Sequence, residues 1–195
     1  MTSIHDAIAD LHRIAYVEGK RQSPARLNSL ADLCVQELES RGLSGVVKEA
    51  RIPGFGREKS WDVVWEYDGK VRLAISLKSI LSNIPGTVPN RIDDLMGEVA
   101  NVQLLSPEIV LGYVMVFNRG EDTADGRWIN RLKRSLDGLS GRGAPAWAPG
   151  TFEAHVLVEA TFGDAPTVHA GTDDFGSFFD TLVARVAERN PGYKG

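Results

Sequence analysis

The spacing of apolar residues predicts five helices. Positions 4, 7, 8, 11 and 14 are apolar and form one face of a first helix. A second helix is expected to open at Ser23-Pro24, with serine as the N-cap and proline in the first turn, and to end at Arg41-Gly42. The same spacing predicts helices over residues 91–105, 128–139 and 174–189.

Shorter stretches have the composition of strands. They span residues 45–51, 61–67, 71–77, 109–117 and 152–161. Asp68-Gly69 joins the second and third of these stretches and is a strong signal for a tight hairpin turn. Residues 81–90 contain two prolines and a glycine, so we expect a loop there.

The order of these elements, α-α-β-β-β-α-β-α-β-α, favours the α/β class. A hairpin followed by a helix and a further buried strand implies a mixed central β-sheet flanked by helices. The chain has 195 residues, of which 43% are hydrophobic, and this is the size of one ordinary domain. We therefore expect residues 1–195 to form a single domain.

Charge, cysteine content and the absence of long apolar segments limit the classes of protein to which the chain can belong. The formal net charge is -4, so the chain is not a basic nucleic-acid coat protein, although a local cluster of Lys and Arg could still bind DNA. The single cysteine, Cys34, excludes an internal disulfide and is expected to be a buried small hydrophobe. The N-terminus lacks the pattern of a signal peptide, and the apolar stretch 109–117 is too short to span a membrane. These features predict a cytoplasmic protein with no membrane partner.

An acid and a lysine stand on the two strands of the expected hairpin. Asp62 begins one strand and Lys78 follows the other, and alternation places Ser76 and Lys78 on one face. A three-residue loop would set Asp62 opposite Ser76, whereas a two-residue loop would pair Asp62 with Ile75 and turn it away. A bulge could correct either register, so both remain open.

The helix after this hairpin carries a second acid. Arg91, Asp94, Glu98 and Asn101 follow spacings of three and four residues and share one stripe. If the helix packs beside the hairpin, Glu98 can reach Asp62 and Lys78. Two carboxylates can hold Mg²⁺ against a phosphodiester, and a nearby lysine can stabilise the developing charge. The three residues thus predict metal-dependent phosphodiester hydrolysis.

This pattern resembles the PD-(D/E)xK nuclease superfamily, in particular Type II restriction endonucleases. In that family an acid on the second strand pairs with an acid-x-Lys motif on the third. The positions here are Asp62 and Ser76-Leu77-Lys78. Serine replaces the expected acid, and Glu98 fits a branch in which that acid has moved to the following helix. The resemblance covers about residues 27–118.

The resemblance implies a restriction-endonuclease-like core with the order α-β-β-β-α-β. It implies a Mg²⁺-dependent hydrolase of a restriction system, an endonuclease that cuts double-stranded DNA as a homodimer. The implied catalytic set is Asp62, Lys78, Glu98 and Ser76, with Asp62 and Glu98 as metal ligands. A glutamate on the first core helix often completes such sites, and Glu37 or Glu39 could be that residue.

Basic residues near this motif and after it are candidates for contacts with DNA phosphates. The densest group lies within residues 127–134, on the helix expected there. The expected DNA-binding residues are Arg57, Lys59, Arg91, Arg127, Arg131, Lys133 and Arg134.

Two other functions compete with a nuclease. The missing acid at Ser76 would fit a catalytically inactive DNA- or protein-binding module on the same fold. The acidic composition would also fit an α/β binding protein with no role in nucleic-acid chemistry. Convergence of Asp62, Lys78 and Glu98 would favour the nuclease, whereas a solvent-facing Glu98 would favour the inactive module.

Overall fold

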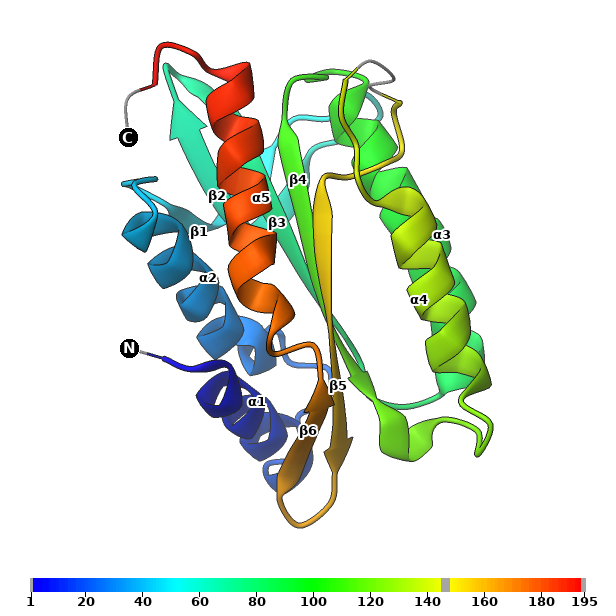
Figure 1. Ribbon diagram of the computed structural model, residues 1–195. Coiled ribbons are helices and arrows are strands. Elements are labelled where there is room, and N and C mark those ends of the chain that lie inside the picture. The colour runs from blue at the N-terminus through cyan, green and yellow to red at the C-terminus, as the bar shows by residue number, and fades with distance from the viewer. Residues whose placement is uncertain (1, 145–147, 194–195) are drawn as a thin grey trace.

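A six-stranded mixed sheet forms the centre of the computed structural model, which describes residues 2–144 and 148–193 (Figure 1). The strands lie in sequence order: β1, β2 and β3 are antiparallel, β3, β4 and β5 are parallel, and β6 is antiparallel to β5. The strands are β1 (Val47–Ile52), β2 (Lys59–Tyr67), β3 (Lys70–Ile80), β4 (Val110–Asn118), β5 (Ala154–Phe162) and β6 (Pro166–Ala170).

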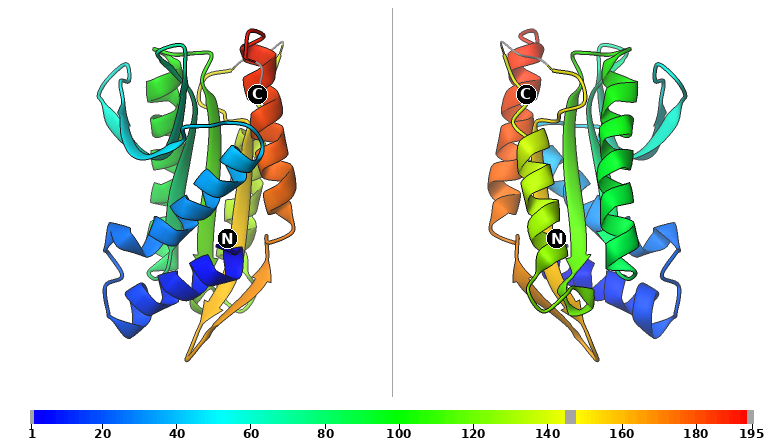
Figure 2. Two further views of the ribbon diagram at one scale, coloured as in Figure 1. Left: turned by 90° about the vertical axis from the view of Figure 1, so that its left-hand side faces the viewer. Right: turned by 90° about the vertical axis from the view of Figure 1, so that its right-hand side faces the viewer.

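Helices cover both faces of the sheet (Figures 1 and 2). One hydrophobic cluster joins α1, α2 and α5 to the sheet, and a second joins α3 and α4 to its other face. All nine residues of β4 are buried, as expected for a central parallel strand. The α-helices are α1 (Ile4–His12), α2 (Asn28–Ser40), α3 (Ile84–Gln103), α4 (Arg127–Leu139) and α5 (Asp174–Arg189). The mixed sheet with flanking helices is therefore confirmed.

The β2–β3 hairpin combines both registers that the sequence left open. Asp68 and Gly69 form a two-residue turn with φ values of 53° and 67°, the left-handed geometry that Asp-Gly favours. Tyr67 pairs with Lys70, but a bulge then shifts the register, so that Val63 pairs with Ile75. Continued by one residue, this register sets Asp62 opposite Ser76.

The expectation of a loop over residues 81–90 was wrong, because α3 begins at Ile84. Pro85 lies in the first turn, where proline costs no hydrogen bond. Pro89 lies inside the helix and removes one backbone donor. Ile84 and Val88 are 1% and 0% exposed, so their burial against the sheet outweighs the low helix propensity of this segment.

Smaller differences from the expected elements have local causes. Ser23 makes no capping hydrogen bond, because a 3₁₀ turn over Pro24–Leu27 precedes α2. Strand β6 was not predicted, since its sequence is short and its residues are mostly exposed at the sheet edge. Cys34 is fully buried, as expected. Within the described residues, no helix combines the length and apolar character needed to cross a membrane.

Candidate active site

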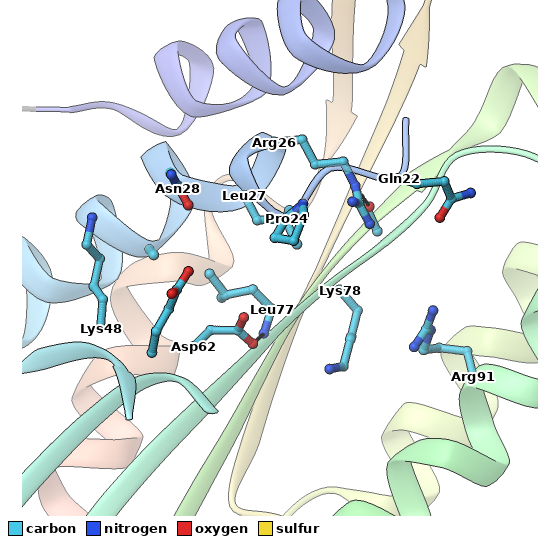
Figure 3. Close-up of a pocket in the computed structure, with 13 residues that line it drawn as sticks. Gln22, Pro24, Arg26, Leu27, Asn28, Lys48, Asp62, Leu77, Lys78 and Arg91 are labelled. Atoms are coloured by element: carbon cyan, nitrogen blue, oxygen red, sulfur yellow. Dashed lines mark hydrogen bonds between the residues drawn. The ribbon is translucent and has the colours of Figure 1, made fainter. Parts of the chain in front are cut away.

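A cleft of about 540 Å³ opens where β2 diverges from β3 (Figure 3). The pairing between these strands ends at Val63–Ile75, while β2 stays paired with β1. The turn before α2 and the middle of α3 complete the walls. The side chains that line the cleft include Gln22, Arg26, Asn28, Lys48, Glu49, Asp62, Lys78, Ser79 and Arg91.

Asp62 uses one carboxylate oxygen to hold the edge of β3. Because the β2–β3 ladder has ended, the Leu77 N–H has no strand partner there, and it donates to Asp62 Oδ2 at 2.7 Å. The Ser76 hydroxyl lies 3.4 Å from the same oxygen. Asp62 Oδ1 makes no hydrogen bond within the described residues. The carboxylate is therefore anchored and still has acceptor capacity toward the cleft.

Burial raises the pKa of Asp62 above its usual range. The Leu77 N–H and the positive charge of Lys78 oppose this rise, and the negative charge of Glu98 adds to it. Asp62 is thus held close enough to Lys78 and Glu98 for their charges to act on it.

Glu98 lies on α3 and is buried against β4, with its side chain 6% exposed. Its Oε1 is 3.3 Å from Lys78 Nζ and also forms an ion pair with Lys59. Its Oε2 accepts a hydrogen bond of 2.9 Å from the Tyr113 hydroxyl. Burial would raise the pKa of Glu98, but these two lysines and Tyr113 outweigh it, so the pKa is lowered. Glu98 is therefore a buried, ionised carboxylate.

Tyr113 and Lys59 complete the surroundings of Glu98. Burial, followed by the charge of Glu98, raises the pKa of Tyr113 well above its ordinary value, so the hydroxyl remains a donor. Lys59 and Glu98 also line a second cavity, of about 390 Å³, on the α3 side of β2. Glu98 thus lies between this second cavity and the Lys78 side of the main cleft.

The structure brings together Asp62, Ser76, Lys78 and Glu98, and it adds Arg91 at the rim of the cleft. It does not bring Glu37 or Glu39 to them. Glu37 forms an ion pair with Arg41 and lines a separate cavity beside the N-terminus, while Glu39 is exposed at the end of α2. The residues of α2 that face the cleft are Asn28 and Ala31, two turns earlier.

Of the predicted DNA-contacting residues, Arg91 lines the cleft, and the other six fall into two groups. Lys59 is held by Glu98, and Arg57 lies exposed in a loop that Asn101 of α3 binds through the Arg57 backbone. The other group lies on α4, which packs beside α3 (Figure 1), and none of its residues lines the cleft.

The α4 group is only partly free of partners. Lys133 forms an ion pair with the buried carboxylate of Glu159. The guanidinium carbons of Arg127 and Arg131 lie 5.1 Å and 5.7 Å from the Trp128 ring. Arg134 is exposed and has no ion pair among residues 2–144 and 148–193.

Several residues of the site were not predicted from the sequence, and three of them show why. Tyr113 stands in a continuous apolar run, and no local pattern reveals a hydroxyl partner on another element. Arg26 lies in the 3₁₀ turn before α2, outside the apolar stripe. Glu49 faces the cleft from β1 with a left-handed φ of 56°, a strained conformation that has no sequence signal here.

Comparison of the chain with protein-family models, with curated proteins and with solved structures gave no match. Within the described part of the chain, no three His, Cys, Asp or Glu side chains form a group that could hold a metal ion by themselves. The chemistry of the cleft therefore has to be inferred from its own residues.

Proposed function

We propose that this chain is a Mg²⁺-dependent endonuclease that hydrolyses phosphodiester bonds in double-stranded DNA. The observation that carries this proposal is the convergence of three side chains from separate elements. Asp62 and Lys78 line one cleft, and Glu98 lies 3.3 Å from Lys78. The order α2-β1-β2-β3-α3-β4 also agrees with the restriction-endonuclease-like core that the resemblance implies.

The carboxylate oxygens at the cleft fit a Mg²⁺ ion that is bound by one protein side chain. Mg²⁺ keeps several waters and commonly uses one or two carboxylates together with the phosphates of its substrate. Asp62 has a free carboxylate oxygen at the cleft, whereas both oxygens of Glu98 are engaged. Asp62 is therefore the primary ligand in this proposal, and Glu98 becomes a second ligand only if Lys59 leaves it. When bound, Mg²⁺ would acidify a coordinated water and neutralise charge that develops on the phosphate.

Lys78 is the charge-stabilising group. Its ammonium lies at the cleft, 3.3 Å from the carboxylate of Glu98. A fixed positive charge in a partly buried cleft stabilises a phosphorane-like transition state more strongly than the same charge in water. Glu98 acts here as a positioning residue, because it fixes the lysine through their ion pair. Ser76 positions Asp62 through its hydroxyl.

Cleavage of mixed-sequence duplex DNA in Mg²⁺ tests the role of Lys78. Lys78→Met is expected to lower the cleavage rate at least about a hundredfold, the usual effect of removing one group that stabilises a transition state. Lys70→Met is the matched control, since Lys70 is an exposed lysine at the start of the same strand. Equal cleavage by the wild type and Lys78→Met would remove Lys78 from the reaction.

A second candidate is a catalytically inactive DNA-binding module on the same fold. Serine at position 76 and the engagement of both Glu98 oxygens favour it. This candidate predicts DNA binding that does not depend on Mg²⁺ and no cleavage with Mg²⁺ or Mn²⁺. The nuclease predicts cleavage that ends when the metal is removed by a chelator. A homodimer with one cleft on each DNA strand remains a prediction of the nuclease proposal.

A further inference from the structure

Two arginines from separate elements point into the main cleft beside Lys78 (Figure 3). Arg26 comes from the 3₁₀ turn before α2, and Arg91 comes from α3 on the opposite wall. Arg26 donates through Nε to the Ser79 hydroxyl at 3.0 Å and through Nη1 to the Ser23 carbonyl at 2.6 Å. These bonds fix the plane of its guanidinium group and leave Nη2 without a hydrogen bond among the described residues.

The charges of this pair are poorly compensated by the protein. Within residues 2–144 and 148–193, no carboxylate forms an ion pair with Arg26. Arg91 has only Asp94, at 3.5 Å, and the Asp94 side chain is 60% exposed. Arg91 Nε is buried and has no hydrogen-bond partner. Burial and the nearby charge of Arg91 lower the pKa of Arg26. Two cations in one partly buried cleft weaken the fold unless an anion binds between them.

We infer that Arg26 and Arg91 form one binding subsite for a phosphate group, next to the position of the reacting phosphate at Asp62 and Lys78. Arginine binds a phosphate through its planar array of N–H groups. Among the described residues, Arg26 Nη2 and the terminal nitrogens of Arg91 make no hydrogen bond, and Arg91 has only the 3.5 Å ion pair with Asp94. The occupant is a phosphodiester of the DNA backbone that flanks the bond to be cut. This inference rests on the proposed function, because it assigns that phosphate to the same DNA substrate.

Binding of a short mixed-sequence DNA duplex, measured with chelator so that no cleavage occurs, tests the subsite. Arg26→Gln and Arg91→Gln are each expected to weaken binding about tenfold, the effect of losing a charged hydrogen bond. Each is also expected to reduce the slope of log K against log salt by about one. The double variant should lose little more than either single variant, because both arginines hold the same phosphate. Arg185→Gln on α5, outside the cleft, is the control for the loss of one positive charge.

The outcomes separate this inference from the proposed function. If both single variants bind DNA with the affinity and salt slope of the wild type, the subsite is ruled out. Cleavage by the wild type that depends on Lys78 would then still support the nuclease. The subsite is also ruled out if the affinity losses of the two single variants multiply in the double variant, because this would indicate that the arginines bind two separate phosphates. Circular dichroism would verify folding, and Arg91→Gln carries the test if Arg26→Gln fails to fold.

Binding of inorganic phosphate is a second test of the subsite and does not need DNA. If the wild type neither binds nor cuts DNA, thermal unfolding of the wild type and of Arg26→Gln in the presence of phosphate tests whether the two arginines bind an anion. A rise in the melting temperature of the wild type, but not of Arg26→Gln, would support an anion subsite and reject the nuclease. No rise in either protein would overturn both.

Discussion

Glu98 is the residue on which the charges of the site depend. It is 6% exposed at its side chain, yet it is ionised, because Lys59, Lys78 and Tyr113 all contact its carboxylate. Burial of a carboxylate is costly without such partners. This one negative charge holds Lys78 at the cleft and Lys59 at the second cavity. A change at Glu98 should therefore affect folding as well as chemistry.

Glu98→Gln is expected to destabilise the protein by about 2 kcal/mol, because it leaves two partly buried lysines without their counter-charge. The cost is lower than for a fully buried pair, since the lysine side chains are 27% and 20% exposed. Chemical denaturation at neutral pH measures the change. Asp94→Asn is the control, because Asp94 lies on the same helix and is largely exposed. A similar small effect of both substitutions would contradict the central role of Glu98.

Asp62→Asn is expected to raise the free energy of unfolding near neutral pH by about 1 kcal/mol. Stability gains of this size are common when a residue of a functional site is replaced. The pKa of Asp62 is raised in the folded state, so its ionised form weakens the fold. This cost is absent below the ordinary carboxyl pKa and complete above the raised one. The difference in melting temperature between the variant and the wild type should therefore grow as the pH rises from acidic to neutral. A variant less stable than the wild type at every pH would contradict this account of Asp62.

At the scale of elements, the hairpin and α3 bring the site together. The Asp-Gly turn alone would set Asp62 in the wrong register, and the bulge between Trp65 and Glu66 corrects it. The end of the β2–β3 ladder then frees the Leu77 N–H for Asp62. Helix α3 places Arg91 at the cleft and Glu98 beside Lys78, both from one side.

The sequence predicted much of this arrangement, for identifiable reasons. Strong helical periodicity gave α1, α4 and α5 close to their observed bounds, and a run of branched and aromatic residues gave β4. It could not give the start of α3, because local proline chemistry indicated a loop while distant packing of Ile84 and Val88 decided the outcome. Asp62, Lys78 and Glu98 were identifiable from residue type and spacing. Tyr113 and Arg26 were not, since their roles depend on contacts between distant elements.

Val88→Ala tests the packing that overrides the prolines of α3. Removal of two buried methyl groups should cost about 2 kcal/mol, and the first turns of α3 should fray before the rest of the helix. Met96→Ala is the matched control, because Met96 is 45% exposed on the same helix. Hydrogen exchange of the α3 amides, combined with denaturant unfolding, measures both effects. Equal costs for the two variants would show that Val88 does not anchor the start of α3.

For the whole molecule, the cleft lies at the boundary between its layers. One helical layer supplies Arg26, the sheet supplies Asp62 and Lys78, and the other helical layer supplies Arg91 (Figure 3). The chain as a whole carries a net charge of -4, but cations gather at this cleft. An acidic protein with a local group of cations is compatible with DNA binding that falls steeply with salt.

The most direct test of the central claim is cleavage of mixed-sequence duplex DNA by the wild type and Asp62→Asn, at a pH where both are folded. The account predicts cleavage by the wild type with Mg²⁺, none with chelator, and a loss of at least about a hundredfold in Asp62→Asn despite its greater stability. Lys70→Met should cut like the wild type. Undiminished cleavage by Asp62→Asn would contradict the account, and so would a wild type that binds DNA but cuts none with Mg²⁺ or Mn²⁺.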